Sequence, residues 1–363
     1  MAMMDVQLNS WLLFEHAPRH FGTTEVVTHL GPEGVHRYTY TDFARRAQQL
    51  MHALDQLGIG QGERVATLAW NSYRHLECYF GIPCTGRILH TLNLRLSPAE
   101  LGWIIADADD RALFVDRDLV PLLERVPEAD RRGVERIVVL SDLVPESSLP
   151  DLLAYERLLA EQPESYPPPD IDEHSPLGLC YTSGTTGRPK GAVYTHRSTV
   201  LHSLAASSAA GLDIGPGDCI LPQVPMFHVN AWGMPYAGVA TGAKQAFLAG
   251  PLDPRSLVDI LFEEEVTIAA GVPTVWLAVA DELALRGSRR HTRRCRRLDF
   301  FRLWNGEARR KPCGRRQGVR SACSARKDCR RRDSACSERN EAVDAIKLNA
   351  AENGFPIGEG GDG

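Results

Sequence analysis

The sequence predicts an α/β protein whose sheets are mostly parallel. Through the first half of the chain, segments with the hydrophobic period of a helix alternate in short order with short apolar runs of strand type. This alternation is typical of parallel strands joined by crossover helices. The chain has 363 residues, of which 43% are hydrophobic and 24% charged, so it is long enough for two or three domains with a sizeable core.

The first half contains one long amphipathic helix and a series of short buried strands. Apolar residues between positions 43 and 57 recur on one helical face, and Gly58 and Gly60 are expected to end this helix. Ser97 is expected to cap a later helix, because its hydroxyl can accept a hydrogen bond from the first helical turn. The other predicted elements are strands at residues 63–70, 88–93, 111–116 and 136–140, and a helix at residues 75–85.

A proline-rich stretch divides the chain. Residues 165–175 contain three consecutive prolines and an acidic flank, which predicts an extended linker over the surface between a first α/β subdomain, residues 1–164, and a second, residues 176–288. In the second subdomain the predicted strands lie at residues 177–183, 193–198, 243–249 and 266–271, and the predicted helices at residues 201–210, 254–264 and 273–285.

The composition changes abruptly near residue 289. Residues 289–339 hold 19 Lys and Arg against 5 Asp and Glu, whereas the whole chain has a formal net charge of -5. Between residues 289 and 340 the only Leu, Ile or Val residues are Leu298, Leu303 and Val319, too few for a core. Arginine, cysteine, glycine and alanine dominate, as in a GC-rich gene read out of frame. We therefore expect residues 289–363 to be a disordered or frameshifted tail that is foreign to the preceding fold.

Cysteine usage and hydropathy indicate the compartment. Four cysteines lie in apolar surroundings before residue 220, five lie in the basic tail, and no secretory signal is recognisable, which argues against a disulfide framework. The tail cysteines have no CxxC spacing, so a zinc site is not expected. No apolar run is long enough to span a membrane. The sequence predicts a cytoplasmic protein without a membrane span or a specific nucleic-acid partner, since charge without an ordered fold is weak evidence for one.

The stretch YTSGTTGRPKG, residues 181–191, has the chemistry of a phosphate-binding loop. Gly184 and Gly187 allow backbone amides to approach anionic oxygens, the hydroxyls between them add donors, and Lys190 supplies a mobile positive charge. A Walker A loop is excluded, because Lys190 follows a proline and precedes a glycine. A flexible Gly/Ser linker is the alternative, but it would not explain Arg-Pro-Lys-Gly between two buried strands.

The loop and the AVYTHRS that follows it resemble the phosphate loop of the adenylate-forming, AMP-binding enzymes. The segments PMFHVNAWGMPYAG, GAKQAFLAGPLDP and AAGVPTVWLAVAD resemble the long- and medium-chain fatty acyl-CoA synthetases of that superfamily, and WNSYRHLECYF and LHTLNLRLSPAEL resemble their N-terminal part. The similarity runs from residue 1 to about residue 285. It implies the N-terminal part of an acyl-adenylate-forming fold, with two mostly parallel sheets flanked by helices.

The resemblance also implies a reaction: a fatty acid and ATP give an acyl-adenylate and pyrophosphate, and coenzyme A then displaces AMP. His228 and Lys190 would be catalytic, and His228 would stand beside the reacting carboxylate. The resemblance assigns to ATP the residues Thr182, Ser183, Gly184, Thr185, Thr186, Gly187, Lys190 and Val229, with Thr182 also near Mg²⁺. It assigns to the acyl chain Trp232 as an aromatic gate together with Gly271, Val272, Pro273 and Thr274.

Plainer roles stay open for some of these residues, and the family pattern is incomplete. His228 and Trp232 could be ordinary core residues, as is expected for Trp276. The Gly-Gly strand, the Thr-Glu metal segment and the C-terminal lysine domain of the family are not found. We therefore expect a fatty acid–CoA ligase whose product is truncated and impaired, or alternatively a non-catalytic remnant that binds fatty acid or a homologous subunit. The resemblance also suggests a homodimer.

Overall fold

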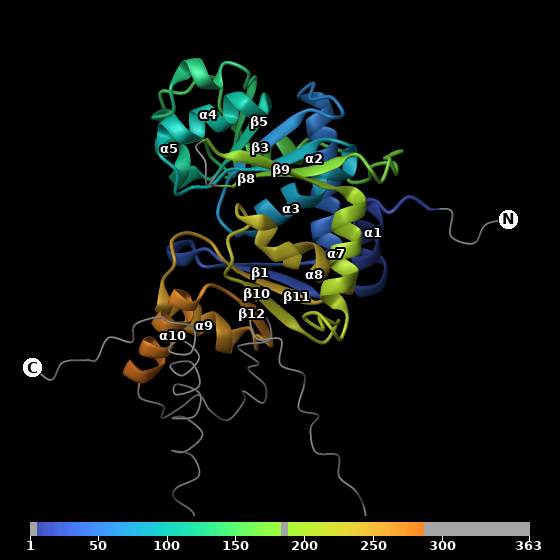
Figure 1. Cartoon of the computed structure of the whole chain (residues 1–363), viewed down its shortest axis with the longest axis vertical. Coiled ribbons are helices and arrows are strands. Elements are labelled where there is room, and N and C mark those ends of the chain that lie inside the picture. The colour runs from blue at the N-terminus through green and yellow to red at the C-terminus, as the bar shows by residue number, and fades with distance from the viewer. Residues whose placement is uncertain (1–5, 183–187, 287–363) are drawn as a thin grey trace, which may run out of the picture.

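The computed structural model describes residues 6–182 and 188–286, and these residues form two sheets flanked by helices (Figure 1). The predicted α/β fold with mostly parallel sheets is confirmed. The strands are β1 (Glu25–His29), β2 (Val35–Thr39), β3 (Arg64–Leu68), β4 (Ile88–Thr91), β5 (Asp110–Val115), β6 (Arg136–Val139), β7 (Leu153–Ala154), β8 (Pro176–Thr182), β9 (Lys190–Thr195), β10 (Cys219–Pro222), β11 (Lys244–Leu248) and β12 (Ile268–Ala270). The α-helices are α1 (Ser10–Phe21), α2 (Tyr40–Gln56), α3 (Tyr73–Gly81), α4 (Pro98–Ala108), α5 (Val120–Glu124), α6 (Tyr155–Ala160), α7 (His196–Ser207), α8 (Met234–Thr241), α9 (Pro254–Glu263) and α10 (Pro273–Leu285).

Among the described residues, one sheet has five strands in the order β12-β10-β11-β1-β2 and the other seven in the order β7-β6-β5-β3-β4-β8-β9. The pairs β1–β2 and β8–β9 are antiparallel, and the others are parallel. Each sheet takes strands from both sides of residues 165–175, so the linker does not separate one sheet from the other. Whether it separates two folding units stays a prediction.

The sheets stack with three helical layers (Figure 1): α4 and α5 cover the outer face of the seven-stranded sheet, α9 and α10 cover the outer face of the five-stranded sheet, and α1, α2, α3, α7 and α8 lie between. Strand residues alternate between these cores, as the period of two requires. Val65 packs in the central core and Ala66 in the outer one, and Ile220 and Leu221 divide in the same way. The central core is the largest, so both sheets depend on the same helices.

Helix boundaries follow local sequence signals. Helix α2 begins with a capping box formed by Thr39 and Asp42. After the helix the chain turns at two glycines with positive φ, Gly58 at 76° and Gly62 at 78°. Ser97 caps α4 as predicted, again in a capping box. The helix predicted at residues 75–85 ends earlier, because Pro83 opens a separate 3-10 turn, Pro83–Thr85.

The proline-rich segment carries no helix or strand, in agreement with the predicted extended linker. It is nevertheless pinned to the first two helices. The Tyr166 backbone N–H donates to Gln48 Oε1 at 2.9 Å in α2, and Asn9 Nδ2 donates to the Ile171 carbonyl at 3.2 Å. Ile171 is buried. The segment therefore crosses the surface of the central helical layer and leads into β8.

Cys78, Cys84, Cys180 and Cys219 are free and buried, as their apolar surroundings predicted. Within residues 6–182 and 188–286, no helix is both long and apolar enough to cross a membrane.

Candidate functional site

The predicted phosphate loop connects β8 to β9. Thr182 is the last residue of β8 and Lys190 the first of β9, and the two are register partners in the antiparallel pair. The Thr182 hydroxyl donates to the Lys190 carbonyl at 3.4 Å, and both residues are exposed. Ser183, Gly184, Thr185, Thr186 and Gly187, which are predicted to contact phosphate, lie outside the described residues. The structure thus brings the two ends of the loop together, and the role of the loop stays a prediction.

Aromatic residues fasten the loop ends to α4. The Arg188 guanidinium lies over the Trp103 ring at 5.4 Å, and the Tyr181 ring meets the same indole edge-on at 6.1 Å between centroids. The Tyr181 hydroxyl also donates to Asp107 Oδ2 at 2.6 Å. A cation over an aromatic face and a charge-assisted hydrogen bond both favour a fixed geometry. Sequence analysis did not identify Trp103 or Asp107, because neither belongs to a recognisable motif.

His228 stands at the start of an unusual turn, Val229–Gly233. Its side chain is exposed, so it is not an ordinary core histidine. Four consecutive non-glycine residues, Val229 to Trp232, have φ between 48° and 55°, and Gly233 follows with 68°. The left-handed region costs about 1–2 kcal/mol per residue for L-amino acids, so other contacts must hold this turn.

Two side chains from neighbouring elements hold the turn. Asn230 is buried, and its Oδ1 accepts a hydrogen bond from the Cys180 thiol at 3.2 Å. His202, on α7, has its Nε2 2.9 Å from the Trp232 carbonyl. Trp232 is half-buried and packs against the central core. Part of its side chain therefore has the core role that the sequence left open. None of these partners was identified from the sequence.

The segment before His228 is bound to the other sheet by Asn71. Asn71 follows β3, and its amide donates to the carbonyls of Pro222 at 2.9 Å and Val224 at 3.1 Å. Its Oδ1 accepts from the Met226 N–H at 2.7 Å. One buried amide therefore satisfies three backbone groups in the turn after β10. The segment WNSYRH resembles the family, but nothing in the sequence indicates that Asn71 contacts β10.

Gly271 to Thr274 lie next to this same turn. Ala270 ends β12, which pairs with β10, and its carbonyl accepts from the N–H groups of Gln223 at 2.6 Å and Val224 at 3.0 Å. A Cβ at Gly271 would stand 3.2 Å from Gln223 Cβ, so this glycine permits close contact. Trp276 is buried as predicted and donates from Nε1 to the Gly271 carbonyl at 3.1 Å. Val272, Pro273 and Thr274 are exposed.

The loop-bearing strand faces the His228 turn. A Cβ built at Gly178 would stand 3.8 Å from Asn230 Nδ2, and Cys180 contacts the same asparagine. Alternate residues of a strand share a face, so Thr182 is on the face of β8 that carries these two residues. The structure therefore connects β8 to the His228 turn through Cys180 and Asn230, and connects the segment that leads to this turn to Ala270, the residue before Gly271.

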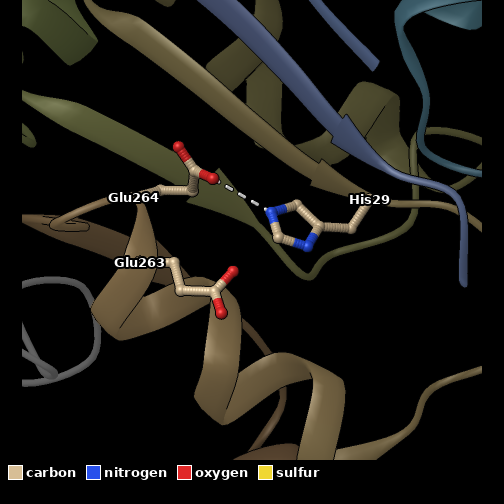
Figure 2. Close-up of side chains that lie close together, drawn as sticks. All are labelled: His29, Glu263 and Glu264. Atoms are coloured by element: carbon tan, nitrogen blue, oxygen red, sulfur yellow. Dashed lines mark hydrogen bonds and ion pairs between the residues drawn. The ribbon is translucent and has the colours of Figure 1, made fainter. Parts of the chain in front are cut away.

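A magnesium role for Thr182 is compatible with its exposure. Mg²⁺ is usually held by one or two protein oxygens together with water and substrate phosphates, so a single hydroxyl at a loop end fits this coordination. Among residues 6–182 and 188–286, one group of three side chains has ligand atoms within 4.8 Å of one another: His29, Glu263 and Glu264 (Figure 2).

That group is an ion-pair cluster on another face of the molecule. Val26 packs in the central core, so His29, three residues on in β1, is on the opposite face of the five-stranded sheet. Glu264 is 2% exposed; its Oε1 lies 3.0 Å from His29 Nε2 and also accepts from Arg37, and its Oε2 lies 3.0 Å from Lys244 Nζ. Burial raises the pKa of Glu264, but hydrogen bonds from these three partners outweigh it and the pKa is lowered. Cations already occupy both oxygens, so the cluster is not a metal centre.

Comparisons with known proteins identify a family. The family model described as AMP-binding enzyme matches residues 13–320, which extends past residue 289, where the foreign tail is predicted to begin; that boundary stays a prediction. The chain is 48% identical over 292 residues to a long-chain-fatty-acid–CoA ligase of Thermus thermophilus, covering 80% of this chain and 52% of that protein. It is 39% identical over 289 residues to a medium-chain-fatty-acid–CoA ligase of Ectopseudomonas oleovorans, covering 79% and 53%. The chain thus spans about half the length of these relatives.

The fold is also that of solved structures. A crystal structure of an anthranilate CoA ligase in complex with anthranoyl-AMP superposes with a TM-score of 0.67 at 24% sequence identity, covering 77% of this chain and 53% of that one. At this identity the likeness shows the fold alone. The resemblance inferred from the sequence motifs is confirmed by the family model and by both relatives.

Proposed function

The chain belongs to the family of AMP-binding enzymes, and from this premise we propose that it activates a long- or medium-chain fatty acid with ATP and transfers the acyl group to coenzyme A. The observation that carries the proposal is the approach of β8 to the His228 turn through Cys180 and Asn230. This contact supports the proposal, because adenylation of a carboxylate requires phosphate-binding groups close to a donor for the carboxylate, and β8 ends at Thr182 while His228 directly precedes the turn.

In this proposal the residues act mainly by position and charge. Lys190 and the Thr182 hydroxyl contact the phosphates of ATP, so that pyrophosphate leaves as its negative charge is neutralised. The His228 side chain donates a hydrogen bond toward the fatty-acid carboxylate as that group attacks the α-phosphate. Val229 lies against the nucleotide. The acyl chain lies along Trp232 and Gly271 to Thr274, where an aromatic ring and a glycine with close backbone contact favour an apolar ligand.

Mg²⁺ would be held by Thr182 together with phosphate oxygens and would supply positive charge to the departing pyrophosphate. The residues that surround it in this chain position the phosphates. Coenzyme A is the acceptor of the acyl group in the second half-reaction, in which its thiol sulfur attacks the acyl carbon and AMP leaves.

The same proposal includes a cytoplasmic location and a homodimer. Four free, buried thiols in the described residues are typical of proteins from a reducing compartment, which supports the location. Dimerisation rests on the family resemblance, and size-exclusion chromatography with light scattering on the full chain would test it.

Exchange of ³²P-labelled pyrophosphate into ATP, dependent on added fatty acid, tests the reaction. We expect exchange with octanoate or palmitate that falls at least tenfold in Lys190→Ala. Arg117→Ala is a matched control, since Arg117 is an exposed cation far along the chain from the loop. Binding of a fluorescent fatty acid without any exchange would contradict the ligase proposal and favour the alternative of a non-catalytic binding protein.

A further inference from the structure

The turn Val229–Gly233 depends on contacts from outside itself. Val229 is β-branched and Trp232 is bulky, and such residues at positive φ are outliers that an isolated chain would not adopt. Asn230 tolerates the left-handed region, and Gly233 adopts it without a steric cost because it has no Cβ. Backbone hydrogen bonds mark its entry, from the Ala231 N–H to the His228 carbonyl at 3.1 Å, and its exit, from the Met234 N–H to the Ala231 carbonyl, but they do not remove the unfavourable φ of Val229 and Trp232. The geometry of the turn is therefore sensitive to the side chains that bind it.

We propose that His202 is a positioning residue that fixes the left-handed turn and so sets the direction of Trp232 toward the acyl chain. The contact is between His202 Nε2 and the Trp232 carbonyl, at 2.9 Å. A carbonyl oxygen only accepts, so Nε2 carries the hydrogen in this contact. The inference rests on the proposed function for its consequence in catalysis, but not for its structural content.

Gly233 gives the contact a second and independent support. A Cβ at Gly233 would stand 2.4 Å from Cδ2 and 2.7 Å from Nε2 of His202, and Gly233 has a φ of 68°. The imidazole therefore lies directly against the backbone of the turn, and a glycine leaves it the room. His202 and Gly233 fit one another, as expected for a histidine that supports this backbone conformation.

The position of Trp232 gives the contact a consequence for specificity. Trp232 follows His228 by four residues through the strained turn, and its side chain packs only in part on the central core. If the carbonyl of Trp232 loses its partner, the turn relaxes toward the right-handed region and the indole changes direction. A long acyl chain must pass the indole, whereas a short chain does not. Loss of His202 should therefore affect long fatty acids more than short ones.

The test compares His202→Ala, His202→Gln and the control Leu204→Ala, all on α7, in the full chain. Leu204 is exposed and two residues from His202. We expect His202→Ala to raise KM for palmitate by about three- to tenfold, the range for one exposed hydrogen bond, while KM and kcat for octanoate stay within about twofold. His202→Gln should restore the palmitate value, because its side-chain amide can donate to the same carbonyl.

Amide hydrogen exchange of peptides that span residues 226–240 separates this inference from the proposed function. We expect faster exchange in His202→Ala and Gly233→Ala, and wild-type exchange in His202→Gln and Leu204→Ala. In a double-variant cycle, Gly233→Ala should cost less when His202 is already alanine, because the clash is gone. Normal palmitate kinetics and unchanged exchange in His202→Ala would overturn the inference. If the wild-type chain shows no ligase activity, unchanged exchange alone overturns it, and the predicted exchange pattern supports it.

Discussion

Asn71 accepts a hydrogen bond from the Met226 backbone N–H at 2.7 Å, and this contact joins the two sheets at the candidate site. Asn71 follows β3 in the seven-stranded sheet, whereas Met226 follows β10 in the five-stranded sheet. The same amide also donates to Pro222 and Val224. The segment that leads to His228 thus takes its path from a residue of the opposite sheet.

Asn71→Ala should lower both stability and activity. It leaves three backbone groups in a buried turn without their partner, which we expect to lower the free energy of unfolding by about 2–4 kcal/mol. Asn71→Asp should be nearly as damaging, because a carboxylate cannot donate to the two carbonyls. Urea unfolding followed by circular dichroism measures the effect. A loss below about 0.5 kcal/mol would show that the sheets are joined by other contacts.

The ion-pair cluster around Glu264 should make the free energy of unfolding fall at low pH. The pKa of Glu264 is lowered in the folded state, so its contribution to stability is fully present above the unfolded-state pKa of about 4.3 and is lost as the pH falls below it. Glu264→Gln should lower the free energy of unfolding by about 2–4 kcal/mol at pH 7, because Arg37 and Lys244 lose a buried counter-charge. Both cations are partly exposed to solvent, which limits the loss. The difference from wild type should be constant between pH 7 and 5 and smaller at pH 3.5.

Glu263→Gln is the control for this measurement. Glu263 is adjacent in sequence and belongs to the same group in Figure 2, but it is exposed. Its replacement should change stability by less than about 0.5 kcal/mol at any of these pH values. Equal effects of the two variants would indicate a general response to lost negative charge instead of a buried ion-pair cluster.

Trp103→Leu should weaken ATP binding without unfolding the chain. It removes the ring that lies under Arg188 and beside Tyr181, and a cation–π contact at an exposed site contributes about 0.5–1 kcal/mol. We expect KM for ATP to rise about two- to fivefold, with kcat and KM for the fatty acid unchanged. Trp103→Phe should retain most of the affinity. Steady-state pyrophosphate exchange at varied ATP measures this, and a change confined to the fatty-acid KM would contradict it.

His228→Ala should reduce adenylation while the fold stays intact. The side chain is exposed, so its truncation should change stability by less than about 0.5 kcal/mol. Loss of the hydrogen bond that orients the attacking carboxylate should lower kcat/KM for exchange by about 10- to 100-fold. His228→Asn should recover part of this if donation alone is required. Unaltered exchange in His228→Ala would assign the histidine to a surface role.

Local elements could be predicted from the sequence where residue chemistry fixes them. Helix α10 begins at Pro273, as predicted, because proline suits the first helical position. Glycines after α2 and the hydroxyl of Ser97 gave similar local signals. Pairing between distant strands has no such signal. Val26 of β1 pairs with Gln245 of β11, and nothing near either residue indicates the other.

The sequence motifs predicted the candidate site residues, but they did not predict the residues that hold them in place. Lys190, His228 and Gly271 could be proposed from the sequence because they lie in recognisable motifs, and their roles stay predictions. The partners Asn71, Cys180 and His202 were not predicted, since they act through contacts with residues remote in sequence. The left-handed turn had Asn230 and Gly233 as local signals, whereas Val229 and Trp232 disfavour it. Tertiary contacts decide the backbone there.

The pairing of β1 with β11 has a consequence during synthesis on the ribosome. The hairpin of β1 and β2 emerges early, but its sheet neighbour β11 is translated only after β3 to β10. Until then one edge of the hairpin is open and the apolar face of Val26 has no sheet to join, a state that is prone to aggregation. The nascent chain should therefore bind chaperones for most of its translation. Because Val26, Val27 and Thr28 are fully buried in the finished sheet, charged side chains cannot protect this edge, and chaperones are needed instead.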